Sequence, residues 1–286
     1  SGHSDGTRQW RQSPFLIRLS LAFFNSGLQT INIPNKVELI GNGAFKKCSS
    51  LKNVTFANSV TSLVIEREAF ANSGLDSITL PNNLESMSDS VFQYSNLKSI
   101  TLPKDMISLP ISTFMYCSQL TDVKLPENLL HINMNAFAYC TSLNSITLPD
   151  NLNSINEYAF AYCSNLEFIE IPNSVIAVEA YAFFRTGLQR VILSESLTTI
   201  NVATFAYCTS LIDIKIPRSV TKILNDAFIY CDKLPYIYIP DSVTIIMRPF
   251  YLCNKLNIEC EFAEKPYGWS NDWNASSRPV KWDVKK

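Results

Sequence analysis

A pattern of 23 residues repeats along most of the chain and constrains its fold more than any other feature of the sequence. Residues 143–165 show the pattern most clearly, and a shift of 23 residues in either direction finds the same order of apolar residues, proline and alanine. One phenylalanine marks every unit, in steps of 22 or 23 with a single step of 25, at Phe23, Phe45, Phe70, Phe92, Phe114, Phe137, Phe160, Phe183, Phe205, Phe228 and Phe250. Such a fixed period predicts a solenoid of about 11 stacked repeats of 22–25 residues, each in contact only with its neighbours.

The residues within one unit predict how each repeat folds. Residues 146–148 alternate apolar and polar positions and begin with the β-branched Ile146, which is typical of a short strand with one inward face. Proline follows in most units and ends strand pairing, because it lacks an N–H. Leu152, Ile155 and Phe160 then supply further inward residues. We predict a leucine-rich-repeat solenoid of the right-handed β/α type, mostly β, with a parallel sheet on the concave face and an irregular or 3-10 outer arc.

The chain divides into three parts by this pattern. Residues 1–20 are expected to be an N-terminal cap or the remnant of a preceding repeat, residues 21–256 the solenoid, and residues 257–286 a C-terminal aromatic cap. The cap contains three tryptophans that would cover the apolar end of the last repeat, and a tryptophan-lined carbohydrate site is the alternative. The chain starts with Ser1 and has no apolar leader or anchor, so a native signal peptide would already have been removed.

Seven of the eight cysteines share one structural position, three residues after the repeat phenylalanine. They are Cys48, Cys117, Cys140, Cys163, Cys208, Cys231 and Cys253. Stacked repeats place such residues about 5 Å apart but with parallel side-chain vectors that do not suit a disulfide. We expect buried free thiols that act as small hydrophobic residues, and the same inward orientation for Cys260.

Composition and residue types exclude several functions. The net charge of −1 gives no strong attraction to nucleic acid, and no apolar run approaches the roughly 20 residues that cross a bilayer. The only histidines are His3 and His131, and we expect His131 in an exposed turn without a serine, cysteine or carboxylate partner. The sequence therefore predicts no enzyme, no metal and no cofactor.

Outward positions of the predicted sheet change character along the chain. The first strands carry serine, threonine and asparagine, whereas later strands carry aromatic, aliphatic and charged residues that are typical of protein-binding surfaces. We predict a ligand-binding surface on the concave face formed by Phe168, Glu170, Arg190, Ile192, Asp213, Lys215, Tyr236 and Tyr238. The alternative is that Glu170–Arg190 and Asp213–Lys215 only pair with each other.

A row of tyrosines stands two residues after the repeat phenylalanine, at Tyr94, Tyr116, Tyr139, Tyr162, Tyr207 and Tyr230. We expect this row on the outer arc, where it packs between repeats rather than forming a second binding face.

The unit L-x-x-I-x-L-P-x-x-L-x-x-I-x-x-x-A-F-x-x-C-x-x-L resembles the BspA-type leucine-rich repeats of bacterial and some protist surface proteins, over about 240 of the 286 residues. The segment from Lys265 to Trp282 also looks like the tail of many bacterial members. The resemblance implies a non-enzymatic protein, secreted or attached to the cell surface, that adheres to a host-surface or extracellular-matrix protein. The alternative is a structural spacer within a larger surface protein.

Overall fold

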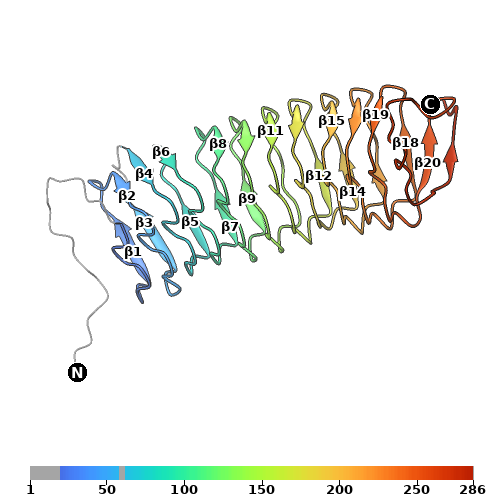
Figure 1. Ribbon diagram of the computed structural model, residues 1–286. Coiled ribbons are helices and arrows are strands. Elements are labelled where there is room, and N and C mark those ends of the chain that lie inside the picture. The colour runs from blue at the N-terminus through green and yellow to red at the C-terminus, as the bar shows by residue number, and fades with distance from the viewer. Residues whose placement is uncertain (1–19, 58–61, 286) are drawn as a thin grey trace.

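The computed structural model describes residues 20–57 and 62–285, so the predicted N-terminal cap lies almost entirely outside the described residues. The described chain winds into an elongated solenoid of about 11 turns, with short strands stacked side by side along its length (Figure 1). No helix occurs among the described residues, and all strand pairs are parallel. The predicted leucine-rich-repeat architecture is confirmed.

The first sheet row contains the strands that the sequence predicts before the repeat proline, and β20 and β21 of the C-terminal segment extend it. Its members are β1 (Thr30–Ile33), β3 (Asn53–Phe56), β5 (Ser77–Thr79), β7 (Ser99–Thr101), β9 (Asp122–Lys124), β12 (Phe168–Glu170), β14 (Arg190–Ile192), β16 (Asp213–Ile214), β18 (Tyr236–Ile239), β20 (Asn257–Cys260) and β21 (Val280–Lys281). The central residue of β5, β9, β12 and β14 is buried between two exposed neighbours, as the alternation predicts. The prediction is wrong at residues 143–148, where no strand forms although Ile146 still packs against the core.

A second sheet row lies along the opposite side of the solenoid and was not predicted (Figure 1). Its members are β2 (Leu39–Ile40), β4 (Leu63–Ile65), β6 (Leu84–Met87), β8 (Ser108–Leu109), β10 (His131–Ile132), β11 (Ser154–Ile155), β13 (Ala177–Val178), β15 (Thr199–Ile200), β17 (Lys222–Ile223) and β19 (Ile245–Ile246). Most are two residues long, too short for alternation to be visible in the sequence. Their pairing with the turns on either side satisfies the backbone after the proline.

The outer arc is the segment that leads from the second sheet row back to the first. In most turns it contains two residues in the left-handed backbone conformation. They stand two residues before and two after the repeat phenylalanine, as with Tyr158 (φ 56°) and Tyr162 (φ 62°). Between them, the N–H of Phe160 donates to the carbonyl of Ala182 in the next turn at 2.8 Å. No β-branched residue occupies these positions, in keeping with the steric cost of positive φ for such side chains.

The repeat phenylalanines form the centre of the core. All are buried, and neighbouring rings stack with centroids 5.0–5.8 Å apart along the whole solenoid. The eight cysteines are buried and free, as predicted. The seven repeat cysteines also have a polar role that the sequence did not reveal, because each thiol donates to the carbonyl of the preceding turn's phenylalanine at 2.8–3.2 Å.

The C-terminal segment continues the 23-residue period with larger side chains. Trp269 forms a parallel β-bridge with Ile246, which stands 23 residues before it. Ser276 accepts a hydrogen bond from the N–H of Leu252 at 2.9 Å. Trp269 and Trp273 are buried and pack on each other and on Trp282, with centroids 4.7–6.0 Å apart. The segment therefore adds one further turn in which tryptophan replaces the smaller apolar residues.

Candidate functional site

The predicted binding residues lie on four successive strands of the first sheet row, with Lys215 directly after β16. They form two columns, since Phe168, Arg190 and Asp213 are register partners across β12, β14 and β16. Glu170 stands beside Ile192 in the other column. Tyr236 and Tyr238 continue the two columns on β18, one period of 23 residues after Asp213 and Lys215. The structure thus brings the eight residues onto one face.

Three large apolar side chains on this face are exposed to solvent. The exposed fractions are 43% for Phe168, 38% for Ile192 and 48% for Tyr236. The outward residues of β5, by contrast, are the exposed Ser77 and Thr79. The face therefore changes from hydroxyl side chains to apolar and charged ones along the solenoid.

The ion pair on this face differs from the alternative pairing predicted from the sequence. Arg190 Nε lies 3.2 Å from a carboxylate oxygen of Asp213, its register partner, rather than pairing with Glu170. Both side chains are more than half exposed, so the pair contributes about 0.2–1 kcal/mol. Neither of the two pairs of that alternative, Glu170–Arg190 and Asp213–Lys215, is an ion pair among the described residues. Strand register places Asp213 opposite Arg190 and Ile192 opposite Glu170.

A shallow hollow of about 420 Å³ adjoins Glu170 and Ile192 on this face. Asp150 and Glu195 also line it, so three carboxylates surround one exposed isoleucine. The hollow therefore combines an apolar side chain with a negatively charged rim.

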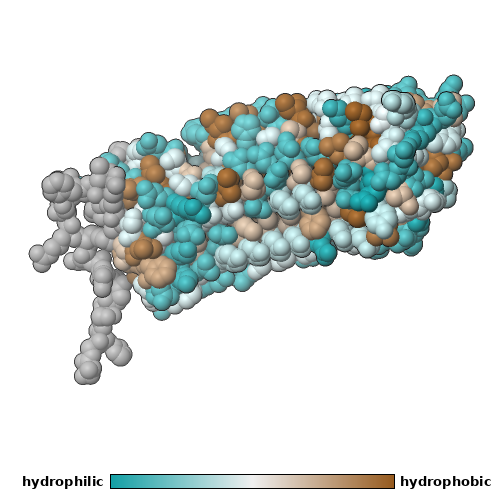
Figure 2. Space-filling view, in the orientation of Figure 1, coloured by the Kyte–Doolittle hydropathy of each residue, from teal (hydrophilic) through white to brown (hydrophobic). Residues whose placement is uncertain are grey.

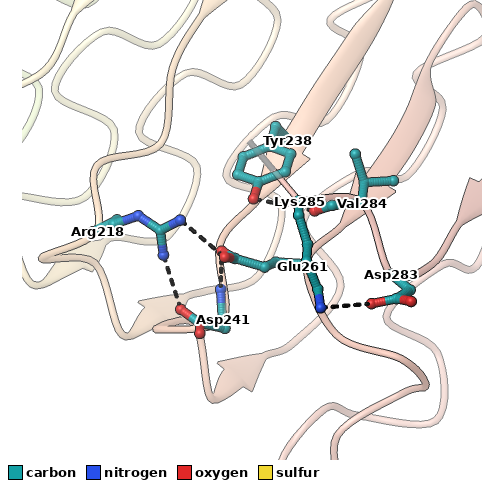
Figure 3. Close-up of polar contacts among 7 residues, drawn as sticks. All are labelled: Arg218, Tyr238, Asp241, Glu261, Asp283, Val284 and Lys285. Atoms are coloured by element: carbon teal, nitrogen blue, oxygen red, sulfur yellow. Dashed lines mark hydrogen bonds and ion pairs between the residues drawn. The ribbon is translucent and has the colours of Figure 1, made fainter.

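Tyr238 contacts the C-terminal segment and is less accessible than the other residues of the face. It is half-buried, and its hydroxyl donates to the carbonyl of Val284 at 3.3 Å (Figure 3). Next to it, the Glu261 carboxylate accepts hydrogen bonds from Arg218 at 2.9 Å and from the N–H of Asp241 at 3.1 Å (Figure 3). The Arg218 guanidinium, followed by the Asp241 N–H, lowers the pKa of Glu261 to about 2. Tyr238 thus helps to anchor the tail.

His131 lies in β10 instead of an exposed turn, and its expected isolation is wrong. It is the register partner of Ser108 and Ser154, and its Nδ1 is 2.9 Å from the Ser154 hydroxyl. This contact joins equivalent positions of neighbouring turns, as does the Asn133–Asn156 hydrogen bond of 2.9 Å. It is therefore part of a polar ladder along the second sheet row.

Residues 20–57 and 62–285 contain no group of three histidine, cysteine or acidic residues arranged for a metal ion. No helix in the same residues is long and apolar enough to span a bilayer. On the side shown in Figure 2, apolar side chains are scattered among polar ones rather than gathered in one patch.

Known structures resemble this chain over most of its length. A leucine-rich repeat protein from Bacteroides ovatus is 26% identical with a TM-score of 0.64, and the match covers 93% of this chain and 86% of that one. The leucine-rich repeat protein of T. pallidum, at 23% identity and a TM-score of 0.54, matches 63% of this chain and 86% of its own. The pneumococcal vaccine antigen PcpA shares the fold at 19% identity and a TM-score of 0.52, covering 93% of this chain and 70% of its own.

Comparison with curated proteins gives no significant match. The family model described as BspA type Leucine rich repeat region matches residues 19–144 and 130–257. This range includes the repeat phenylalanines, the seven repeat cysteines and all eight residues of the predicted binding surface. The chain belongs to the BspA-type leucine-rich-repeat family.

Proposed function

We propose that this chain is a non-enzymatic recognition module, secreted or attached to the bacterial cell surface, that adheres to a host-surface or extracellular-matrix protein. The contact surface is the face of β12, β14, β16 and β18 defined above. The observation that carries the proposal is the change along the first sheet row from serine and threonine to exposed Phe168, Ile192 and Tyr236. Exposed aromatic and arginine side chains at the centre of a face supply much of the binding energy in protein interfaces.

The charges of this face indicate the chemistry of the partner. Glu170, Asp150 and Glu195 surround the hollow beside Ile192. Arg190 is more than half exposed and retains free N–H groups beyond the Nε that contacts Asp213. A partner that inserts a lysine or arginine next to an apolar side chain would meet complementary groups on this face.

Capture of extracellular proteins tests the proposal. The protein is immobilised and exposed to solubilised host-surface and matrix proteins, beside a variant with Arg190→Ala and Tyr236→Ala. Tyr238 is left unchanged because it holds the tail. A matched control carries Ser77→Ala and Thr101→Ala on the first half of the same sheet row, and all three proteins must have equal melting temperatures.

The expected result is a captured protein that the control retains and the Arg190/Tyr236 variant loses. Capture that is equal for all three proteins would place the contact elsewhere on the molecule. No capture by any of them would favour the alternative, a spacer within a larger surface protein.

A further inference from the structure

Two rows of large side chains lie outside the first sheet row, and they differ in how they are covered. Neighbouring tyrosines of the outer arc stack on each other, as Tyr139 and Tyr162 do with centroids 4.2 Å apart, which confirms the predicted packing between repeats. On the second sheet row, along the opposite side of the solenoid (Figure 1), the exposed fractions are 58% for Ile107, 37% for Leu130 and 57% for Ile176. We call these three residues the aliphatic row.

The aliphatic row occupies one position of the repeat, the residue directly before a strand of the second sheet row. Its three members precede β8, β10 and β13, and the half-buried Asn153 precedes β11 between them. The residues directly before β2, β15, β17 and β19 are Glu38, Thr198, Thr221 and Thr244. The fold therefore does not require an apolar side chain at this position, and the middle turns differ from the others in carrying one.

The backbone of the aliphatic row is already paired from turn to turn. The N–H of Leu130 donates to the carbonyl of Ile107 at 2.7 Å, and the N–H of Asn153 donates to the carbonyl of Leu130 at 2.8 Å. The N–H of Ile176 donates to the carbonyl of Asn153 at 3.0 Å. A ligand at the aliphatic row must therefore bind through side chains, because no strand can be added between these turns.

A shallow hollow of about 410 Å³ adjoins the first half of the aliphatic row. It is lined by Asp105, Ile107, Asn128, Leu130 and Asn151. A carboxylate oxygen of Asp105 lies 3.7 Å from the Lys104 ammonium, and both side chains are exposed, so this pair is weak. The hollow thus offers aliphatic side chains beside oxygen atoms that accept hydrogen bonds from a cation.

The charge of the middle turns has one sign. Residues 125–184 contain six acidic residues and no lysine or arginine. Three of the six flank the aliphatic row on its two sides, since Glu127 lies in the turn before β10, whereas Glu157 and Glu179 follow β11 and β13. None of these three carboxylates is in an ion pair within the part of the chain that the structure describes. An apolar row between unpaired carboxylates is complementary to a partner with an apolar stripe between cations.

A basic amphipathic helix has this arrangement. Its apolar side chains form one stripe, and lysines or arginines at both edges of the stripe reach the carboxylates on both sides of the aliphatic row. An extended segment alternates its side chains between two faces, so its cations would point away when its apolar face binds. A single metal ion does not fit, because residues 20–57 and 62–285 contain no group of three acidic, histidine or cysteine residues that could hold one. We propose that the second sheet row binds a basic amphipathic helix of another protein, with the apolar stripe of that helix on the aliphatic row.

Fluorescence anisotropy of a labelled peptide, titrated with the whole protein, tests this proposal. The probe is a peptide of leucine and lysine in which the leucines recur at helical spacing and form one stripe. One comparison peptide has glutamate in place of lysine, and a second has the composition of the probe in an order that forms no stripe. The row variant carries Ile107→Thr, Leu130→Thr and Ile176→Thr, because threonine is the residue that the chain itself has before β15, β17 and β19.

Matched variants separate the apolar contribution from the charge. Ile212→Thr is the control for the row variant, because Ile212 is 50% exposed and lies outside the second sheet row. A charge variant with Glu127→Gln and Glu157→Gln removes one carboxylate on each side of the aliphatic row. Its control carries Glu38→Gln and Glu264→Gln, which removes two exposed carboxylates elsewhere on the chain.

We expect the leucine–lysine peptide to bind and both comparison peptides to bind at least tenfold more weakly. The row variant should lose at least tenfold in affinity for the leucine–lysine peptide, whereas Ile212→Thr should leave the affinity unchanged. The charge variant should bind severalfold more weakly than its control, and its affinity should depend less steeply on salt concentration.

Several outcomes would overturn the proposal. They are no binding of the leucine–lysine peptide, equal binding of either comparison peptide, or full affinity in a row variant that retains its melting temperature. Self-association of the protein that the row variant loses would also overturn it, because a second copy would then cover the aliphatic row. If the row variant fails to fold, the charge variant and its control still decide, since equal affinity in both contradicts a role of the flanking carboxylates. The Arg190/Tyr236 variant should bind the peptide normally, which separates this site from the proposed function of the first sheet row.

Discussion

Replacing Phe160 by alanine should remove a central element of the solenoid core. The side chain is fully buried, and its ring stacks on Phe137 at 5.1 Å and on Phe183 at 5.5 Å. A buried aromatic ring of this kind removes about 150–250 Å² from water, which corresponds to about 4–6 kcal/mol. Alanine retains part of that burial, and the paired strands on both sides hold the turns apart so that the cavity cannot close. We expect Phe160→Ala to lower the free energy of unfolding by about 3–5 kcal/mol.

Equilibrium denaturation followed by circular dichroism measures this change. Phe168→Ala is the matched control, since Phe168 is 43% exposed and its loss should change the free energy of unfolding by about 0.5 kcal/mol or less. A loss below about 1 kcal/mol for Phe160→Ala would contradict the assignment of the phenylalanine row as the centre of the core.

Three further predictions concern the thiols and the tail. Cys140→Ala should cost about 1 kcal/mol in unfolding free energy, because the thiol's hydrogen bond to Phe114 is lost. Cys140→Ser, which retains a donor and matches the natural Ser95, should cost less, and the reverse order in denaturant titrations would refute the donor role. Burial raises the pKa of the buried thiols, to about 12 for Cys163, so a thiol reagent at pH 8 should label the native protein far more slowly than the unfolded one. The Glu261 carboxylate, whose pKa falls from 4.5 to about 2, stabilises the fold above pH 4.5, and that stabilisation is lost as the pH falls through 2. Glu261→Gln should therefore flatten the fall in melting temperature over this pH range, and an unchanged pH profile would count against the Arg218 contact.

The repeat period was enough to predict the fold from the sequence. An apolar side chain that recurs every 22 or 23 residues is buried only when successive repeats stack on one another. The buried row of phenylalanines follows from this stacking. The second sheet row was missed because strands of two residues, such as Ile245–Ile246, carry no readable alternation. The thiol hydrogen bonds were missed because a buried cysteine looks the same in sequence whether it packs or donates. The extra C-terminal turn was missed because Trp269 and Trp273 differ from the residues they replace.

The repeat pattern predicts only part of the proposed binding surface, because strand register and the path of the C-terminal tail also shape it. The alternation predicted which side chains face outward, and the structure places all eight on one face. Which charges pair depends on strand register, so the Arg190–Asp213 contact was not predicted. The contact of Tyr238 with Val284 depends on the path of the tail, which no repeat rule describes.

The most direct test of the proposed function is the affinity of the captured protein for two single variants, measured by biolayer interferometry. Arg190→Ala changes the face of β14, and Ser99→Ala changes the equivalent outward position of β7 in the same sheet row. We expect Arg190→Ala to weaken binding at least tenfold, about 1.4 kcal/mol, and Ser99→Ala to leave it unchanged. Equal affinities for the two variants, at equal melting temperatures, would contradict recognition through the second half of this sheet.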